Sequence, residues 1–252
     1  MKPIILNIPH SSALIPDKTG FIIDDAEIKK EILKLTDWYT DDLFSAEDIH
    51  ILKADFSRIF CDVERFADDS REIMSKSGMG MLYERTDDGR LMRTVSTKLR
   101  KKIKMDFYDK YHQKFNIIVK EILDEKGKCL IIDCHSFPDS PLKRDLNKEK
   151  PRPDFCIGTD KFHTRDELVE KIEEFIKSSG YSVKIDNPYT GSIVPIEQYQ
   201  KNNNVQSVMI EVNRKLYMNE STGEKIKGYK NTKKFIQSLI EILKETEISL
   251  DS

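Results

Sequence analysis

Two of the five histidines in this 252-residue chain, His10 and His135, occupy equivalent positions relative to predicted strands. Each follows a short apolar run, at residues 4–8 and 130–134, and each is followed directly by a serine. The carboxyl ends of parallel strands lie at the same edge of a sheet, so two such side chains can converge in a crevice there. Neutral imidazole is a good ligand for Zn²⁺, although a lone histidine at a strand end is more often a structural residue. The residues by themselves leave both interpretations open.

A catalytic zinc site typically has three protein ligands and a water, and a carboxylate is a common third ligand. The aspartates available for this role are Asp37, Asp41, Asp62 and Asp133. Asp37 stands among apolar and aromatic neighbours, and its alternative role is the N-cap of a helix. Asp133 is alternatively a partner that orients a ligating histidine.

Three further charged residues suit amide chemistry. Glu211 lies inside the apolar run at residues 208–212, where burial would raise its pKa toward that of a general base; the alternative is an edge-strand glutamate that faces water. Arg58 and Arg65 stand seven residues apart around an apolar centre. One guanidinium can polarise a carbonyl and the other can bind a carboxylate with two hydrogen bonds, while Asp62 braces one of them.

Short apolar runs, typical of strands, alternate along the chain with longer amphipathic stretches, typical of helices. These predicted elements must position the residues named above. Strands alternating with helices predict a largely parallel sheet covered on both faces, with chemistry beyond the carboxyl ends of the strands. Long irregular segments are expected at residues 66–95 and 137–153, and loops of this length are usually functional or mobile. The apolar runs predict strands at 4–8, 49–54, 129–134, 155–157, 181–185 and 205–212, and the amphipathic stretches predict helices at 25–44 (in two pieces), 96–124, 164–178 and 231–243.

The composition is that of a soluble globular protein, with 38% hydrophobic and 34% charged residues and a formal net charge of -2. No basic face is concentrated enough to indicate a nucleic-acid or membrane partner. The four cysteines form no CxxC pair, and no apolar stretch is long enough for a membrane span. We therefore expect a reduced, cytoplasmic protein, and the sequence leaves its oligomeric state open.

The sequence resembles the N-formylglutamate amidohydrolases over nearly its whole length. The matching stretches occur in the family's order and are specific as a set. They are IPHSS at 8–12, TDW at 36–38 with DDL at 41–43, residues 57–65 from Ser57-Arg58 to Arg65, YH at 111–112, IDCHS at 132–136, PDF at 153–155, NPYTG at 187–191 and EVNRKLYM at 211–218.

This resemblance implies a single α/β domain over residues 1–252, with a twisted, mostly parallel or mixed sheet, helices on both faces and a fold like that of zinc carboxypeptidases and aspartoacylases. It implies one Zn²⁺ per chain. Related enzymes place a glutamate ligand three residues after the first histidine, where this chain has Ala13, and Asp37 is therefore predicted as the third ligand. The implied roles are metal ligands for His10, Asp37 and His135, general base for Glu211, oxyanion stabilisation for Arg58, and substrate binding for Arg65, Ser57, Asn187 and Tyr189.

The expected activity is hydrolysis of the amide of a small N-acyl amino acid such as N-formylglutamate. One departure concerns substrate recognition, because Glu64 stands where related enzymes have the asparagine of an asparagine–arginine pair that holds a carboxylate. Two alternatives remain: a deacylase or carboxypeptidase that acts on another acyl amino acid or short peptide, and a metal-free protein that binds a carboxylated ligand.

Overall fold

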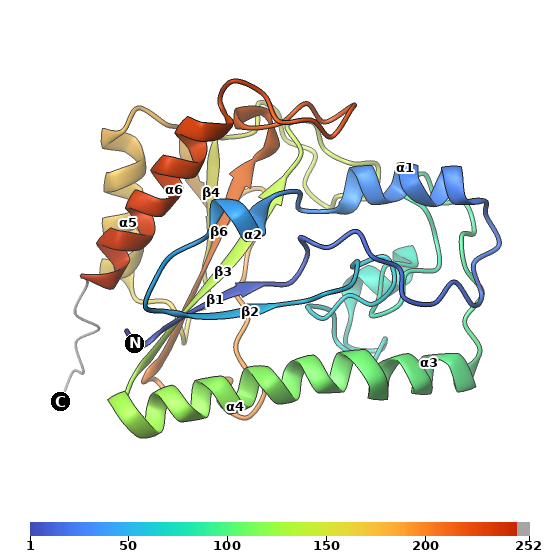
Figure 1. Cartoon of the computed structure of the whole chain (residues 1–252), viewed down its shortest axis with the longest axis horizontal. Helices are drawn as coiled ribbons and strands as arrows, with labels where there is room; N and C mark the ends of the chain where they lie inside the picture. The colour runs from blue at the N-terminus through green and yellow to red at the C-terminus, as the bar shows by residue number, and fades with distance from the viewer. Residues whose placement is uncertain (246–252) are drawn as a thin grey trace.

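The computed structural model describes residues 1–245 and contains one six-stranded mixed sheet with the strand order β2-β1-β3-β6-β4-β5 (Figure 1). Neighbouring strands run parallel from β2 to β6, whereas β4 runs antiparallel to β6 and parallel to β5. The predicted α/β domain with a mixed sheet is therefore confirmed. The strands are β1 (Ile4–Ile8), β2 (His50–Lys53), β3 (Cys129–Phe137), β4 (Phe155–Gly158), β5 (Val183–Ile185) and β6 (Val205–Asn213).

Helices cover both faces of this sheet. Helices α5 (Asp166–Ser178) and α6 (Tyr229–Lys244) lie on one side, and α3 (Thr97–Ile103) and α4 (Asp109–Lys126) lie on the other, as Figure 1 shows. Helix α1 (Asp25–Leu35) precedes the short α2 (Thr40–Leu43), so the predicted break within residues 25–44 is confirmed. No helix within residues 1–245 is long and apolar enough to cross a membrane.

The two faces of the sheet differ. The face toward α5 and α6 is apolar, whereas the face toward α3 and α4 changes from apolar to polar along the strands. On β3, Leu130 and Ile132 pack into the core formed with α5 and α6. Ile131 packs into the second core, against α3 and α4, and the next residues on that same face are Asp133 and His135. The amino-terminal half of the α4-side face is thus hydrophobic, and its carboxyl-terminal half is lined by polar side chains.

Strand β3 continues three residues beyond its predicted end at residue 134. Its pairing with β6 runs through His135↔Glu211 to Phe137↔Asn213, and every residue of both strands is buried. The prediction stopped where polar residues began, because apolar patterning cannot recognise a strand whose polar side chains are buried in a site.

The helix predicted at residues 96–124 is continuous in space but contains a π-helical turn, η2 (Lys104–Tyr108), between α3 and α4. Such turns shift the faces of a helix relative to one another and are frequent at functional sites. Here the turn is followed directly by residues that contact the polar end of the sheet.

The first irregular segment, residues 66–95, contains the 3-10 helix η1 (Ile73–Ser77) and packs on a third, smaller core. That core contains Met79, Tyr83 and Met92, and Leu142 from the second irregular segment contacts it. The two segments therefore lie against each other. The four cysteines are free and buried.

Candidate active site

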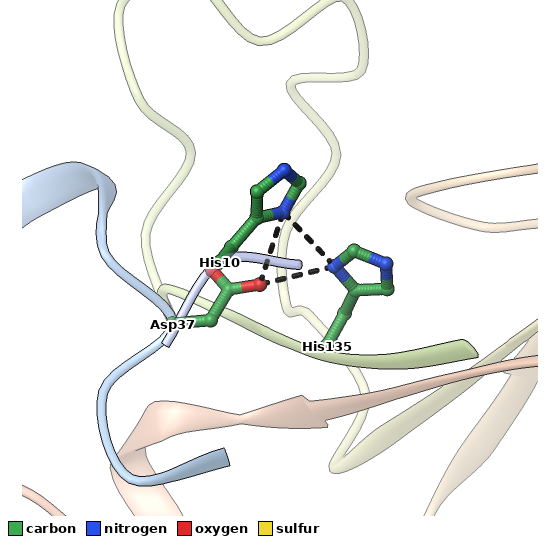
Figure 2. Close-up of side chains that lie close together, drawn as sticks. All are labelled: His10, Asp37 and His135. Atoms are coloured by element: carbon green, nitrogen blue, oxygen red, sulfur yellow. Dashed lines mark hydrogen bonds and ion pairs between the residues drawn. The ribbon is translucent and has the colours of Figure 1, made fainter. Parts of the chain in front are cut away.

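Three ligand-type atoms from His10, Asp37 and His135 converge near the carboxyl ends of β1 and β3 (Figure 2). His10 Nδ1 lies 3.3 Å from His135 Nδ1, and Asp37 Oδ2 lies 3.0 Å from His135 Nδ1 and 3.6 Å from His10 Nδ1. In a tetrahedron with metal–ligand bonds of about 2.0–2.1 Å, neighbouring ligand atoms are about 3.3 Å apart. The spacing of these three atoms therefore fits three corners of a zinc site.

Separate elements bring the three side chains together. His10 follows β1, His135 lies on β3, and Asp37 occupies the break between α1 and α2, where its backbone N–H donates to the His10 carbonyl (3.0 Å). Asp37 is not a helix N-cap, because Tyr39 holds that position in α2 with a φ of 67°. The helix break thus directs the Asp37 carboxylate toward the two imidazoles.

The outward-facing nitrogen of each histidine contacts a carboxylate. His10 Nε2 lies 2.9 Å from Asp62 Oδ1, and His135 Nε2 lies 3.0 Å from both Asp133 Oδ1 and Glu64 Oε2. An ionised carboxylate only accepts hydrogen bonds, so each Nε2 donates a hydrogen to its carboxylate partner. With a metal bound, each Nδ1 would present its lone pair, whereas without a metal a hydrogen on Nδ1 can be donated to Asp37. The interpretation of Asp133 as an orienting partner agrees with this contact, and carboxylate–histidine pairs of this kind commonly orient metal ligands.

The arrangement has an electrostatic consequence that supports a cation site. Two imidazole lone pairs and one carboxylate oxygen point into the same buried space, which is repulsive unless a proton or a cation lies between them. Burial by itself lowers the pKa of His135, but the charges of Glu64 and Asp133 raise this pKa well above its ordinary value. Burial raises the pKa of Asp37, but hydrogen bonds from both histidines and the charge of Arg214 hold it well below its usual range. The surroundings therefore favour positive charge between these side chains, and the nitrogen and oxygen donor set suits Zn²⁺.

Glu211 pairs with His135 in the β3–β6 register and lies on the same face of the sheet. It is 7% exposed, and its Oε2 has no hydrogen-bond partner within residues 1–245. Burial raises the pKa of Glu211 to about 8. The alternative of a solvated edge-strand glutamate is excluded because β6 lies between β3 and β4.

Arg58 and Arg65 share the Asp62 carboxylate. Arg58 donates to Asp62 Oδ2 from Nη2 (3.1 Å) and Nε (3.3 Å), and Arg65 Nε lies 3.6 Å from the same oxygen. The side chains of Arg58 and Arg65 are 16% and 26% exposed, whereas those of His10 and Asp37 are 1% exposed. The two arginines are therefore the more accessible of these four side chains.

Glu64 does not pair with Arg65, its neighbour in the sequence. Its Oε2 contacts His135, and its Oε1 accepts a hydrogen bond from Asn7 Nδ2 (3.1 Å). Arg65 Nε has no hydrogen-bond partner within the described residues. The Glu64 carboxylate is thus directed toward the sheet and does not pair with the Arg65 guanidinium.

Helix α4 and the π-helical turn before it hold the backbone of this arginine segment. Tyr108 OH donates to the Arg65 carbonyl (2.9 Å), and His112 Nε2 donates to the Val63 carbonyl (2.8 Å). Tyr111, on the same helix face, donates to Asn7 Oδ1 (2.5 Å). His112 therefore helps to position the backbone of the arginine segment.

Sequence reasoning assigned no role to Arg214 or Tyr83. Arg214 donates to Asp37 Oδ1 (2.9 Å) and to the Ser136 carbonyl (3.1 Å), and it is 3% exposed. Tyr83 OH donates to Asp62 Oδ2 (2.8 Å). Only the resemblance offered a signal for Arg214, through its matching stretch at 211–218, and nothing in the local pattern indicated Tyr83.

The three remaining predicted substrate-binding residues lie in different settings. Ser57 is fully buried, and its Oγ accepts the Ile59 N–H, so it shapes the turn before Arg58 and offers no surface to a ligand. Asn187 donates to Glu149 Oε2 (2.7 Å), a contact between two loops. Tyr189 OH donates to Asp145 Oδ2 (3.2 Å) and accepts from Arg152 Nη1 (3.3 Å), and burial together with the charges of Asp145 and Glu211 raises its pKa.

Other candidates for metal binding lie elsewhere or are otherwise engaged. Asp41 forms an exposed ion pair with Lys53 (3.2 Å). His163 is buried, and its ring nitrogens contact the Val205 carbonyl and the Gln200 N–H. Neither belongs to the cluster of ligand atoms formed by His10, Asp37 and His135.

Residues 2–218 match the family model described as N-formylglutamate amidohydrolase. The chain belongs to the N-formylglutamate amidohydrolase family. The fold is similar to the crystal structure of N-formylglutamate amidohydrolase from Ralstonia eutropha JMP134, with a TM-score of 0.85, 21% identity, and coverage of 97% of this chain and 93% of that one. It is also similar to a gene product from Agrobacterium tumefaciens, with a TM-score of 0.66, 17% identity, and coverage of 97% and 92%. No curated protein matches the sequence.

As a member of the N-formylglutamate amidohydrolase family, the chain is a hydrolase of the amidohydrolase type that acts on a small molecule. The solved structures are too distant in sequence to show more than the fold. Any assignment of the metal and the substrate must therefore rest on this chain's own side chains.

Proposed function

We propose that this protein is a zinc-dependent hydrolase that cleaves the amide of a small N-acyl amino acid, with N-formylglutamate as the first candidate substrate. The observation that carries this proposal is the convergence of His10 Nδ1, His135 Nδ1 and Asp37 Oδ2 at separations of 3.0–3.6 Å. Membership of the amidohydrolase family supports the reaction type.

His10, Asp37 and His135 would hold the metal, which supplies a Lewis acid that polarises a carbonyl and lowers the pKa of a water molecule. Asp62 and Asp133 keep the two imidazoles in the tautomer that presents Nδ1. Arg214 holds the Asp37 carboxylate through its other oxygen, Oδ1. The ligand atoms are therefore oriented in advance by a layer of buried hydrogen bonds.

Glu211 is the proposed general base. Its Oε2 lacks a partner among the described residues, and its pKa of about 8 places proton transfer near neutral pH. It takes a proton from the water that attacks the amide carbon, and it delivers that proton to the amine nitrogen as the C–N bond breaks. The products are a free amino acid and a small carboxylic acid, which is formate for an N-formyl substrate.

Arg58 and Arg65 have different proposed roles. Arg58 is anchored by Asp62 and stabilises the negative charge that develops on the amide oxygen. Arg65 is more exposed than Arg58, so its guanidinium binds the substrate carboxylate. Glu64 is engaged with Asn7 and His135 and leaves that guanidinium accessible.

Metal analysis combined with substrate profiling tests the proposal. Protein purified without chelators should contain one equivalent of zinc and hydrolyse N-formyl amino acids in preference to N-acetyl or longer N-acyl compounds. His135→Ala should fold but lose most of its zinc, whereas His163→Ala, which removes a buried histidine away from the site, should retain zinc if it folds.

The alternatives predict different outcomes. Stoichiometric zinc with turnover only of longer acyl groups or dipeptides would indicate the deacylase or carboxypeptidase alternative. A folded protein that binds carboxylates without zinc and without turnover would indicate a binding protein and overturn the proposal.

A further inference from the structure

A surface cavity of about 590 Å³ lies where the two irregular segments meet, and it is lined by residues outside the candidate active site. One wall comes from the first segment, with Lys76, Arg85 and Gly89, and the other comes from the second segment, with Lys143 and Arg144. Its size is in the range of small-molecule sites. The cavity thus belongs to neither segment alone.

The charges around this cavity are unbalanced. Lys76, Lys143 and Arg144 form no ion pair with any residue in the part of the chain that the structure describes, and Arg85 only donates to the Gly89 carbonyl (2.9 Å). Four cations therefore face one space in a protein whose formal net charge is -2. Such a local excess attracts anions even when the whole molecule is slightly acidic.

The two aspartates of the lining are already engaged. Asp87 is 6% exposed and its Oδ1 accepts the Arg144 N–H (3.2 Å), so its carboxylate joins the two segments. Asp88 pairs with Arg90, which is not part of the lining (3.1 Å). With these two carboxylates set against the four cations, the lining keeps an excess of two positive charges.

The Arg144 guanidinium is held in place by its packing against Gly89. A Cβ at Gly89, where φ is +93°, would come within 2.9 Å of Arg144 Nη2, so the guanidinium lies against the bare face of this glycine. Its Nε is shielded from solvent and has no hydrogen-bond partner within residues 1–245. A planar guanidinium held in this way with unused donors suits an oxyanion.

From these observations we propose that the cavity is a second anion site, distinct from the candidate zinc site, which binds a small phosphate-bearing metabolite. The phosphate oxygens would accept from Arg144 and the neighbouring lysines, and the volume leaves room for an attached organic group. A bound anion would join residues 76–89 to residues 143–144 and reinforce the Asp87–Arg144 contact. The proposal does not depend on zinc or on the identity of the acyl substrate.

Calorimetric titration of the full-length, metal-loaded protein at low ionic strength tests this site, with inorganic phosphate and 3-phosphoglycerate as probes. The double variant K143Q/R144Q should weaken binding at least ~10-fold, because it removes two side chains that donate charge-assisted hydrogen bonds to the anion. The matched control is K110Q/K120Q, which removes the same charge from exposed lysines of α4 and should change affinity less than ~2-fold. Arg144→Lys should give an intermediate loss, since lysine keeps the charge without the planar fork.

Two outcomes would overturn the proposal. One is absence of binding by the wild type at ~10 mM of either probe, where even a site with a Kd of about 1 mM would be largely filled. The other is binding that survives K143Q/R144Q but disappears in Arg65→Ala, which would place the anion in the active site. If K143Q/R144Q folds poorly, the affinity of Arg144→Lys is the test instead, and an unchanged affinity in that variant would contradict the proposal. Slower hydrogen exchange in residues 76–89 and 143–145 on phosphate addition is the independent supporting result, and unchanged exchange in both would contradict the bridging role.

Discussion

Replacing Glu211 by glutamine should abolish most of the activity and at the same time stabilise the metal-free protein at alkaline pH. Glu211 is 7% exposed and its Oε2 lacks a hydrogen-bond partner among residues 1–245, so ionising it in the folded state is costly. Its pKa is raised from 4.5 to about 8, chiefly by burial. Glutamine has nearly the same shape but carries no charge to desolvate.

The direction and the size of this pH-dependent change in stability follow from proton linkage. A carboxyl group with a raised folded-state pKa contributes stability that is fully present below its unfolded pKa and is lost as the pH rises through its folded pKa. For Glu211 this window runs from about pH 4.5 to about pH 8. Between pH 5.5 and 8.5, linkage with these two values gives a loss of about 3 kcal/mol, which is a large fraction of a typical stability of 5–15 kcal/mol.

Urea denaturation of the two proteins in EDTA, across pH 5.5 to 8.5, measures this effect. Asp37 and Asp62 stay ionised in both proteins across this range, because their pKa values lie well below the ordinary value. The free energy of unfolding of the wild type should decrease by about 3 kcal/mol relative to that of Glu211→Gln as the pH rises over this range. A difference that does not change with pH would refute the view that Glu211 is buried without a compensating partner.

The same variant, loaded with zinc, should retain the metal and lose kcat by at least ~10²-fold, the usual scale for general-base catalysis. Asp37→Ala should lose zinc, whereas Asp133→Ala should retain it with weaker affinity; the opposite result in metal analysis would exchange their roles. Arg58→Ala should lower kcat by ~10²-fold with little change in KM, and Arg65→Ala should mainly raise KM, because only the second removes binding common to substrate and transition state. Identical kinetic defects in the two variants would contradict this division. Tyr108→Phe should raise KM several-fold without loss of zinc, since it releases the Arg65 carbonyl, and an unchanged KM would show that this hydrogen bond does not position the arginine.

Most of the architecture could be predicted from periodicity. The six strands lie within a few residues of their expected positions, because each carries an apolar face that patterning detects. The exceptions lie next to the site. Strand β3 extends through His135 and Ser136, and a π-helical turn interrupts the helix that precedes Tyr111. In both places polar or irregular features are stabilised by tertiary contacts that no local pattern records.

The sequence by itself determined which side chains reach the carboxyl edge of the sheet. Alternation along β3 places Asp133 and His135 on one face, and the apolar runs around Glu211 and before His10 bring these two residues to strands of the same sheet. These assignments depend on the two-residue period of a strand, which is a local property. The choice of Asp37 as the third ligand came from the family resemblance together with its aromatic neighbours.

Only the tertiary structure decided how these groups are paired. It shows that Asp62 contacts His10 and both arginines, that Glu64 turns toward Asn7 and His135, and that Arg214 holds Asp37. The partners in these contacts are separated by up to 177 residues along the chain. Pairing in a buried site is decided by side-chain direction and distance at the sub-ångström level, and these follow from the packing of the whole fold rather than from any segment of the sequence.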